Sequence, residues 1–293
     1  MATDGILNVY KPVGPTSFAV VARLRRLLRL RRIGHAGTLD PLASGVLLLL
    51  LGRATRLSCY LQALPKTYRV GAYLGKATTT YDEEGEVVWE ADPWGIDEGA
   101  VHKALAEMTG RFLQQPPSYS AVKVKGKPAY VYARSGQSVQ PPPRWVEVYR
   151  FQLLEFRLPE LFLEVECSQG TYVRSLVHEL GLKLGCGAYV RWLMRTAVGP
   201  FTVEESIPLS LLEEEIGRAQ WSHRLLPLDA GLSYMLAISL GPEEVAAVVN
   251  GRPICRPGDG ERARAYGPDG ALVAILRWDP QQGLWRPETV FAP

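Results

Sequence analysis

The sequence predicts a folded chain of mixed α/β class that ends in a smaller β-rich unit. Strand-like and helix-like hydrophobic periodicities keep alternating along most of the chain. Of its 293 residues, 47% are hydrophobic and 22% are charged, which is ordinary for a folded protein and excludes disorder as the dominant state. A length of roughly 150 residues per domain suggests two domains, and the pattern changes near residue 232. We therefore expect one domain over residues 1–232 and a second over 233–293.

The N-terminal region is expected to form a strand and then an amphipathic helix. Residues 5–10 have the pattern of a short strand, and after a Pro/Gly break either Thr16 or Ser17 can cap a helix. Its apolar residues share one stripe: Val20, Val21, Leu24, Leu27 and Leu28. The opposite side carries arginines, including Arg23 and Arg26, so the positive charge should point outward.

The later elements follow from the same two periodicities. The apolar run 46–51 is short enough for a buried strand. Helices are expected over 54–64, 97–108 and from about 173 onward, and strands over 67–74, 147–156 and 161–167. In the tail, a short strand, a helix over 242–249 and a hairpin around 267–270 indicate a compact β-rich unit.

Positive charge is concentrated in two segments. Residues 11–56 contain nine Lys or Arg and a single acid, Asp40, whereas residues 118–140 contain four Lys or Arg and no acid. Prolines bracket the second segment, which indicates an excursion from the core, and tyrosines alternate with its lysines. Either segment alone is also explained as a solvated helix face or a small tyrosine-packed hairpin. Together they favour a polyanion such as RNA.

Several other classes of protein are excluded by what the sequence lacks. No apolar run approaches the ~18 to 20 residues of a membrane span, and no signal-peptide pattern opens the chain, so we expect a cytoplasmic protein. The four cysteines show no metal-binding spacing and are expected to be buried small hydrophobes. Phosphate-loop, dinucleotide and GxSxG patterns are missing, and we expect neither a metal nor an organic cofactor.

Two charged residues stand out as candidates for chemistry. Asp40 is a lone carboxylate in a segment rich in glycine and cations, which would favour its ionised form and allow it to act as a nucleophile or base. Taken alone, Asp40 is better explained as a turn or cap aspartate than as a catalytic group. Arg174 falls in the first turn of a predicted helix, where a cation opposes the helix dipole, so an anionic partner is expected.

Four segments together resemble the motifs of TruB-type tRNA pseudouridine-55 synthases. The segment Gly34–Leu47, GHAGTLDPLASGVL, resembles the signature of that family. The other three lie in the family's order: Gly5–Pro12 with Thr16 and Ser17, Lys66–Val70, and Gly170–Leu176 followed by Leu184–Ala188. The tail is similar to a short, bacterial-type PUA-like RNA-binding domain.

The resemblance implies a pseudouridine synthase fold around a largely antiparallel sheet, and isomerisation of the T-loop uridine of tRNA by base flipping. It implies catalytic roles for Asp40 as nucleophile, for Tyr68 in stacking and proton transfer, and for Arg174 as the partner of Asp40. His35, Tyr172 and Leu193, with Tyr68, are expected to line the nucleotide pocket. The segment 118–140 falls where the family carries an RNA-gripping insertion. The expected RNA contacts are Lys11, Arg23, Arg26, Lys123 and Lys125.

The expected partner is the T-arm of tRNA, bound by a monomer with no obligate protein partner and no membrane. Two alternatives stay open: a pseudouridine synthase that acts on another RNA, and a non-catalytic tRNA-binding or folding protein. Asp40 distinguishes the second alternative, because phosphate binding gives no reason for a carboxylate among cations.

Overall fold

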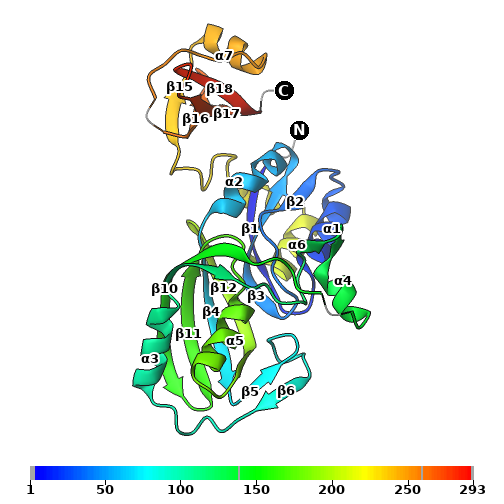
Figure 1. The fold of residues 1–293 in the computed structure, drawn as a ribbon. Helices are drawn as coiled ribbons and strands as arrows, with labels where there is room; N and C mark the ends of the chain where they lie inside the picture. Colours follow the sequence, from blue (N-terminus) through cyan, green and yellow to red (C-terminus); the bar gives the residue numbers. More distant parts are fainter. Residues whose placement is uncertain (1–3, 138, 259, 292–293) are drawn as a thin grey trace.

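The computed structural model describes residues 4–137, 139–258 and 260–291, and within them a ten-stranded sheet dominates (Figure 1). Its eight-strand path is β14 (Ile207–Pro208), β1 (Gly5–Lys11), β3 (Ala43–Leu51), β12 (Ala188–Val198), β4 (Lys66–Leu74), β11 (Glu160–Cys167), β10 (Arg144–Arg157) and β7 (Gly110–Gln114). β2 (Ile33–His35) pairs with β3, and β13 (Phe201–Thr202) pairs with β12. Only the pairs β1–β14 and β3–β12 run parallel among these described strands. The mixed α/β fold with a largely antiparallel sheet is confirmed.

Strand β3 explains the uninterrupted apolar run of the sequence, because the sheet is covered on both faces there. One face packs against α1 (Ser17–Leu28) and α6 (Leu209–Gly217), and the other against η1 (Gly52–Leu57) and α2 (Ser58–Ala63). The side chains alternate between the two faces: Leu47, Leu49 and Leu51 on the first, and Val46, Leu48 and Leu50 on the second.

The other half of the sheet is covered by α3 (Glu98–Glu107) and α5 (Val173–Lys183), which pack on β10, β11, β4 and β12 (Figure 1). Asp97 caps α3 by accepting a hydrogen bond of 2.7 Å from the amide of Ala100. Thr16 caps α1 in the same way through the amide of Ala19. These two caps and the apolar stripes explain why the helices begin where they do.

Two excursions leave the central sheet. β5 (Lys76–Thr78) and β6 (Val87–Glu90) form a hairpin beside the end of β12. The basic segment 118–140 contains the small hairpin of β8 (Lys123–Val124) and β9 (Lys127–Pro128), followed by α4 (Ala129–Arg134). Figure 1 shows α4 projecting from the body of the molecule, as expected of an excursion.

The C-terminal unit, residues 236–291, has its own sheet in the order β15 (Leu236–Ser239), β16 (Arg262–Tyr266), β17 (Leu272–Asp279) and β18 (Leu284–Val290), with α7 (Pro242–Val249) against it. β18 was not predicted from the sequence. Trp285 of β18 is fully buried in this unit's core. Phe291 and Ile275 instead join the core of the larger unit, and the hydroxyl of Tyr60 donates a 2.9 Å hydrogen bond to Glu288.

Some local predictions were wrong. Leu27 was placed on the buried stripe of α1 but is 43% exposed, because the helix turns it away from α6 and the sheet. Cys59 and Cys255 are exposed, whereas Cys167 and Cys186 are buried as expected. The predicted helix over 54–64 begins as the 3₁₀ turn η1 before α2.

Among the described residues, no helix is both long and apolar enough to cross a bilayer.

Candidate active site

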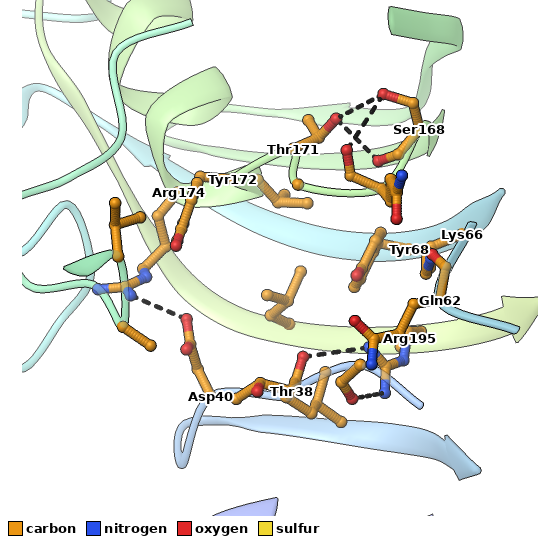
Figure 2. Close-up of a pocket in the computed structure, with 18 of the residues that line it drawn as sticks. Thr38, Asp40, Gln62, Lys66, Tyr68, Ser168, Thr171, Tyr172, Arg174 and Arg195 are labelled. Carbon is orange, nitrogen blue, oxygen red and sulfur yellow. Dashed lines mark hydrogen bonds and ion pairs between the residues drawn. The ribbon is translucent and has the colours of Figure 1, made fainter. Parts of the chain in front are cut away.

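A pocket of about 620 Å³ lies where β3, β12 and β4 run side by side (Figure 2). The strand register explains which residues meet there. Arg195 of β12 is opposite Gly45 of β3 on one side and Tyr68 of β4 on the other. The loop that carries Asp40 enters β3 directly above this row, so residues far apart in the sequence converge on one cavity.

The Asp40 loop is held at its base by the start of α1. The hydroxyl of Ser17, which is buried, donates to the carbonyl of Leu39 at 3.0 Å and accepts from the amide of Leu39 at 2.8 Å. The amide of Gly14 donates to the carbonyl of Pro41 at 2.8 Å. The loop is therefore fixed on both sides of the aspartate, which limits the positions that its side chain can take.

Arg195 holds the same loop from the opposite side. Its buried guanidinium donates to the carbonyls of Val46 at 2.7 Å and of Gly37 and Thr38 at 3.2 Å each (Figure 2). Gly45 permits this approach, because a Cβ there would lie 2.2 Å from the carbonyl oxygen of Arg195. A cation that binds two carbonyls of the loop and one of strand β3 clamps the loop backbone to the sheet.

Asp40 is paired with Arg174 as expected. Arg174 Nη2 lies 2.9 Å from Asp40 Oδ2, and the side chain of Asp40 is 33% exposed to the pocket whereas that of Arg174 is 7% exposed (Figure 2). A charge-assisted bond of this length orients the carboxylate. One oxygen of Asp40 is held by the protein wall while the group still reaches the cavity.

Arg174 also binds a second carboxylate, which the sequence analysis missed. Its Nη1 lies 3.0 Å from Asp82 Oδ2 in the loop between β5 and β6, and the carbonyls of Thr80 and Tyr119 accept further hydrogen bonds from its Nη groups at 3.1 and 3.0 Å. Its buried Nε has no hydrogen-bond partner. Asp82 is itself fixed, because Thr80 Oγ1 and the amide of Glu84 donate to its Oδ1. The first-turn position of Arg174 was a signal for an anionic partner, but it could not show that there are two.

Tyr68 and Leu193 form the apolar wall of the pocket, as predicted. Both are largely buried, on the neighbouring strands β4 and β12. Burial raises the pKa of Tyr68, against the opposite effect of Arg195, so its hydroxyl stays protonated at neutral pH. A planar ring at this position can stack on a nucleobase, and the neutral hydroxyl can donate a hydrogen bond.

Tyr172 lines the pocket just before α5 and is held by its backbone. Buried Gln114 of β7 forms a two-bond clamp with it: the amide of Tyr172 donates to Oε1 at 2.8 Å, and Nε2 donates to the carbonyl of Tyr172 at 3.0 Å. Ser175 Oγ donates to the carbonyl of Gln115 at 2.9 Å. The end of β7 thus sets the position of the helix start that carries Arg174.

Two predicted site residues lie elsewhere. His35 is not among the residues that line the pocket; it is in β2, with Nδ1 buried and without a hydrogen-bond partner. Lys11 is fully buried, and its ammonium group donates to the carbonyls of Pro12 at 2.8 Å and Pro15 at 2.9 Å. The prediction that Lys11 contacts phosphate is therefore wrong in this structure: its donors hold the turn beside the Asp40 loop. Burial lowers the pKa of Lys11 to about 8.

The other predicted RNA contacts are on the surface. Arg26, Lys123 and Lys125 are exposed, as binding to a polyanion requires. Arg23 is exposed as well, but it forms an ion pair with Glu213 of α6. The acidic residues of α6 therefore reach the basic face of α1 at this contact.

The arrangement favours chemistry by an oriented carboxylate in a partly closed pocket. Within the described residues, no group of three or more His, Cys, Asp or Glu side chains is placed to hold a metal ion. The charged groups of the pocket are one accessible carboxylate and the cations Arg144, Arg174, Arg195 and Lys66. Such a site can bind a polyanion and present a nucleophile or base to it.

Comparisons with known proteins agree with this geometry. Residues 25–173 match the model for the N-terminal domain of the TruB family pseudouridylate synthases. Residues 174–233 match the model for the tRNA pseudouridylate synthase B C-terminal domain, and residues 235–292 match the model for the C-terminal region of tRNA pseudouridine synthase II. The chain is 40% identical to the tRNA pseudouridine synthase B of Dehalococcoides mccartyi over 98% of this chain and 96% of that protein. It is also 40% identical to that of Burkholderia pseudomallei, with the same coverage.

Among solved structures, the fold matches a Cbf5-Nop10-Gar1 complex with a TM-score of 0.77 and 28% identity, over all of this chain and 86% of the other. It also matches an H/ACA RNP bound to a substrate RNA, with a TM-score of 0.76 and 25% identity over the same shares. The fold and the site together define a pseudouridine synthase, an isomerase that acts on RNA. Within that class, the chain belongs to the TruB family.

Proposed function

We propose that this enzyme isomerises the uridine at position 55, in the T-loop of tRNA, to pseudouridine. The observation that carries the proposal is the Asp40 carboxylate, oriented by Arg174 at 2.9 Å and open to a pocket walled by Tyr68 and Leu193. The relatives named tRNA pseudouridine synthase B support tRNA as the substrate.

The reaction exchanges one bond for another within the same nucleotide. The bond between C1′ and N1 of uracil breaks, the base rotates, C5 bonds to C1′, and the proton on C5 is lost while N1 gains one. A uridine in a folded loop must leave its stack first, and the ring of Tyr68 replaces part of that stacking, at ~1 to 3 kcal/mol per base.

Asp40 supplies the charge that starts the reaction, by attack at C1′ or C6 or by removal of a proton from C2′. Arg174 keeps the carboxylate aimed through its 2.9 Å ion pair. Leu193 and Tyr68 exclude water that would otherwise capture the detached base. In this proposal the hydroxyl of Tyr68 takes part in the later proton transfer by passing its own proton on as it accepts the proton from C5.

RNA binding is divided along the chain. We place catalysis in residues 1–232, gripping of the T-arm on Arg26, Lys123, Lys125 and the segment 118–140, and contacts with more distant parts of tRNA in residues 233–293. Exposed cations beside tyrosines suit this task. The enzyme works as a cytoplasmic monomer without a cofactor or protein partner in this proposal.

The test is to map pseudouridine in unmodified tRNA after incubation with the purified protein, with and without EDTA. We expect modification at position 55 alone, in both conditions. Asp40→Asn should abolish it while binding stays within about tenfold, because the side chain keeps its size and loses its charge. Asp92→Asn, an exposed aspartate outside the pocket, is the matched control. Modification of a ribosomal transcript but not of tRNA would favour another RNA substrate, and turnover by Asp40→Asn would contradict the role of Asp40.

A further inference from the structure

Four cationic side chains line the pocket, and three of them are already committed to protein acceptors. Arg174 binds two carboxylates and two carbonyls, and Arg195 binds three carbonyls. Lys66, which is buried, donates to the carbonyls of Gln62 and of Leu64. These three groups hold the walls of the site and have few donors left for a ligand.

Arg144 is the fourth cation and differs from the others. It is the first residue of β10, and within the described part of the chain no carboxylate lies within ion-pair distance of its guanidinium. Its Nε is buried without a hydrogen-bond partner, as is the Nε of Arg174, but no protein acceptor among the described residues binds either Nη group of Arg144. A guanidinium that lines a pocket and has no protein acceptor for its Nη groups can take an acceptor from a ligand in that pocket.

The surroundings of Arg144 hold it in place without using up its donors. The guanidinium carbon lies 5.7 Å from the centre of the Tyr172 ring, a cation–π contact. Gly170 lies beside the same guanidinium, since a Cβ there would be in van der Waals contact with Arg144 Nη1 at 3.4 Å. Gly170 also has a φ of +82°, which a larger residue would adopt only with strain.

We propose that Arg144 binds a backbone phosphate of the RNA next to the flipped uridine, and that it couples this contact to Tyr172. The planar fork of a guanidinium matches two phosphate oxygens, and a phosphate supplies the negative charge that no protein group provides at this position. The phosphate would anchor the nucleotide in the same pocket that Asp40 lines. This inference rests on the proposed function only for the identity of the RNA.

The test is a cycle that pairs a change in the protein with a change in the RNA. Each hairpin of a T-arm series carries one neutral methylphosphonate, at a different linkage around the target uridine. Each is compared with a hairpin that has the ordinary phosphate and the same sugar at that linkage. For the wild-type protein, substitution at one linkage should raise the concentration needed for half-saturation in single-turnover assays by about tenfold to a hundredfold. For Arg144→Gln, the affinity for the ordinary RNA should fall by a similar factor. The methylphosphonate at that one linkage should then cause no additional loss of affinity.

Two more variants separate binding from structure. Arg144→Lys keeps the charge without the fork and should recover part of the affinity. Arg111→Gln is the matched control, because Arg111 lies on the neighbouring strand β7, against Trp145 and outside the pocket. It should leave the methylphosphonate pattern unchanged. The salt dependence of binding should become shallower by about one counterion for Arg144→Gln only.

The outcomes are distinct. If every methylphosphonate lowers the affinity of Arg144→Gln by the same factor as that of the wild type, Arg144 does not bind phosphate. If Arg144→Gln instead lowers the rate at saturating RNA with unchanged half-saturation, Arg144 only positions Tyr172. Failure of the wild-type protein to form pseudouridine in the unmodified hairpin would overturn the proposed function, and the same cycle measured as binding affinity would still decide whether Arg144 takes the phosphate.

Discussion

Arg174 is bound to Asp82, with Nη1 3.0 Å from Oδ2, at the same time as its Nη2 lies 2.9 Å from Asp40. Asp82 is only 3% exposed and is held in the loop between β5 and β6. One guanidinium therefore faces two carboxylates, one structural and one open to the pocket. The position of the reactive group depends on a hairpin far from it in the sequence.

The first prediction concerns this second carboxylate. Asp82→Asn should lower the single-turnover rate by about tenfold to a hundredfold, because a hydrogen bond to a charged partner contributes ~1.5 to 3 kcal/mol and its loss frees Arg174 to turn. Binding of tRNA should change less than threefold, since Asp82 is buried away from the RNA. Glu84→Gln, an exposed neighbour in the same loop, is the control. Equal rates for the wild type and Asp82→Asn would show that Asp40 is positioned without this loop.

A second prediction uses two glycines with nearly the same backbone conformation. Gly45 has a φ of +105° and Gly14 a φ of +110°, but a Cβ at Gly45 would collide with the backbone of Arg195, whereas nothing lies within 4 Å of one at Gly14. Gly14→Ala should cost about 1 to 2 kcal/mol of unfolding free energy from strain alone. Gly45→Ala should cost clearly more and also reduce turnover, because strand β3 and the Asp40 loop must move away from β12. Urea unfolding and single-turnover rates measure both, and equal effects would mean that the close approach is not needed.

The sequence was sufficient for elements whose causes are local. The Thr16 cap, the alternation that makes β4 a strand and the apolar run of β3 all depend on neighbours in the chain. In the site, Asp40 and Arg174 stood out as candidates because each is anomalous in its position: a carboxylate among cations, and a cation at the start of a helix. Their roles and their pairing were predicted from the resemblance of their segments to the family motifs.

Residues whose role depends on distant pairing could not be predicted. Asp82 resembles any loop aspartate until the β5–β6 hairpin brings it to Arg174. Arg195 is one of several arginines in its segment, and only the β3–β12 register shows that it clamps the Asp40 loop. Lys11 was predicted to contact RNA because it belongs to a basic segment, but its side chain is buried in the structure. Charge patterns along a sequence do not show which cations are buried.

A third prediction follows from the buried lysines. Burial lowers the pKa of Lys11 and of Lys66 to about 8, below the ordinary value of 10.5. Between about pH 8 and 10.5 the unfolded chain therefore holds more protons on these groups than the folded one, so they make the free energy of unfolding rise with pH in that window and contribute no slope below it. Urea unfolding at pH 7.5, 8.5 and 9.5 should show a shallower rise for Lys11→Met than for the wild type. Exposed Lys125→Met should keep the full slope, and three parallel curves would contradict the shift.

The last prediction concerns the C-terminal unit, which has two separable roles. Phe291 and Ile275 belong to the core of the larger unit, so deletion of residues 233–293 uncovers apolar surface there. We expect this truncation to lower the thermal midpoint and to weaken activity on a T-arm hairpin and on full tRNA alike.

A surface variant should separate support of the fold from contact with RNA. Arg252 and Arg277 are exposed on the C-terminal unit, outside the core that it shares with the larger one. Arg252→Gln with Arg277→Gln should leave the midpoint and hairpin activity unchanged, yet weaken binding of full tRNA and make its salt dependence shallower, because each lost phosphate contact releases about one counterion fewer. If the double variant binds full tRNA as the wild type does while the truncation weakens both RNAs, the unit supports the fold through Phe291 and Ile275 and does not grip RNA through these arginines.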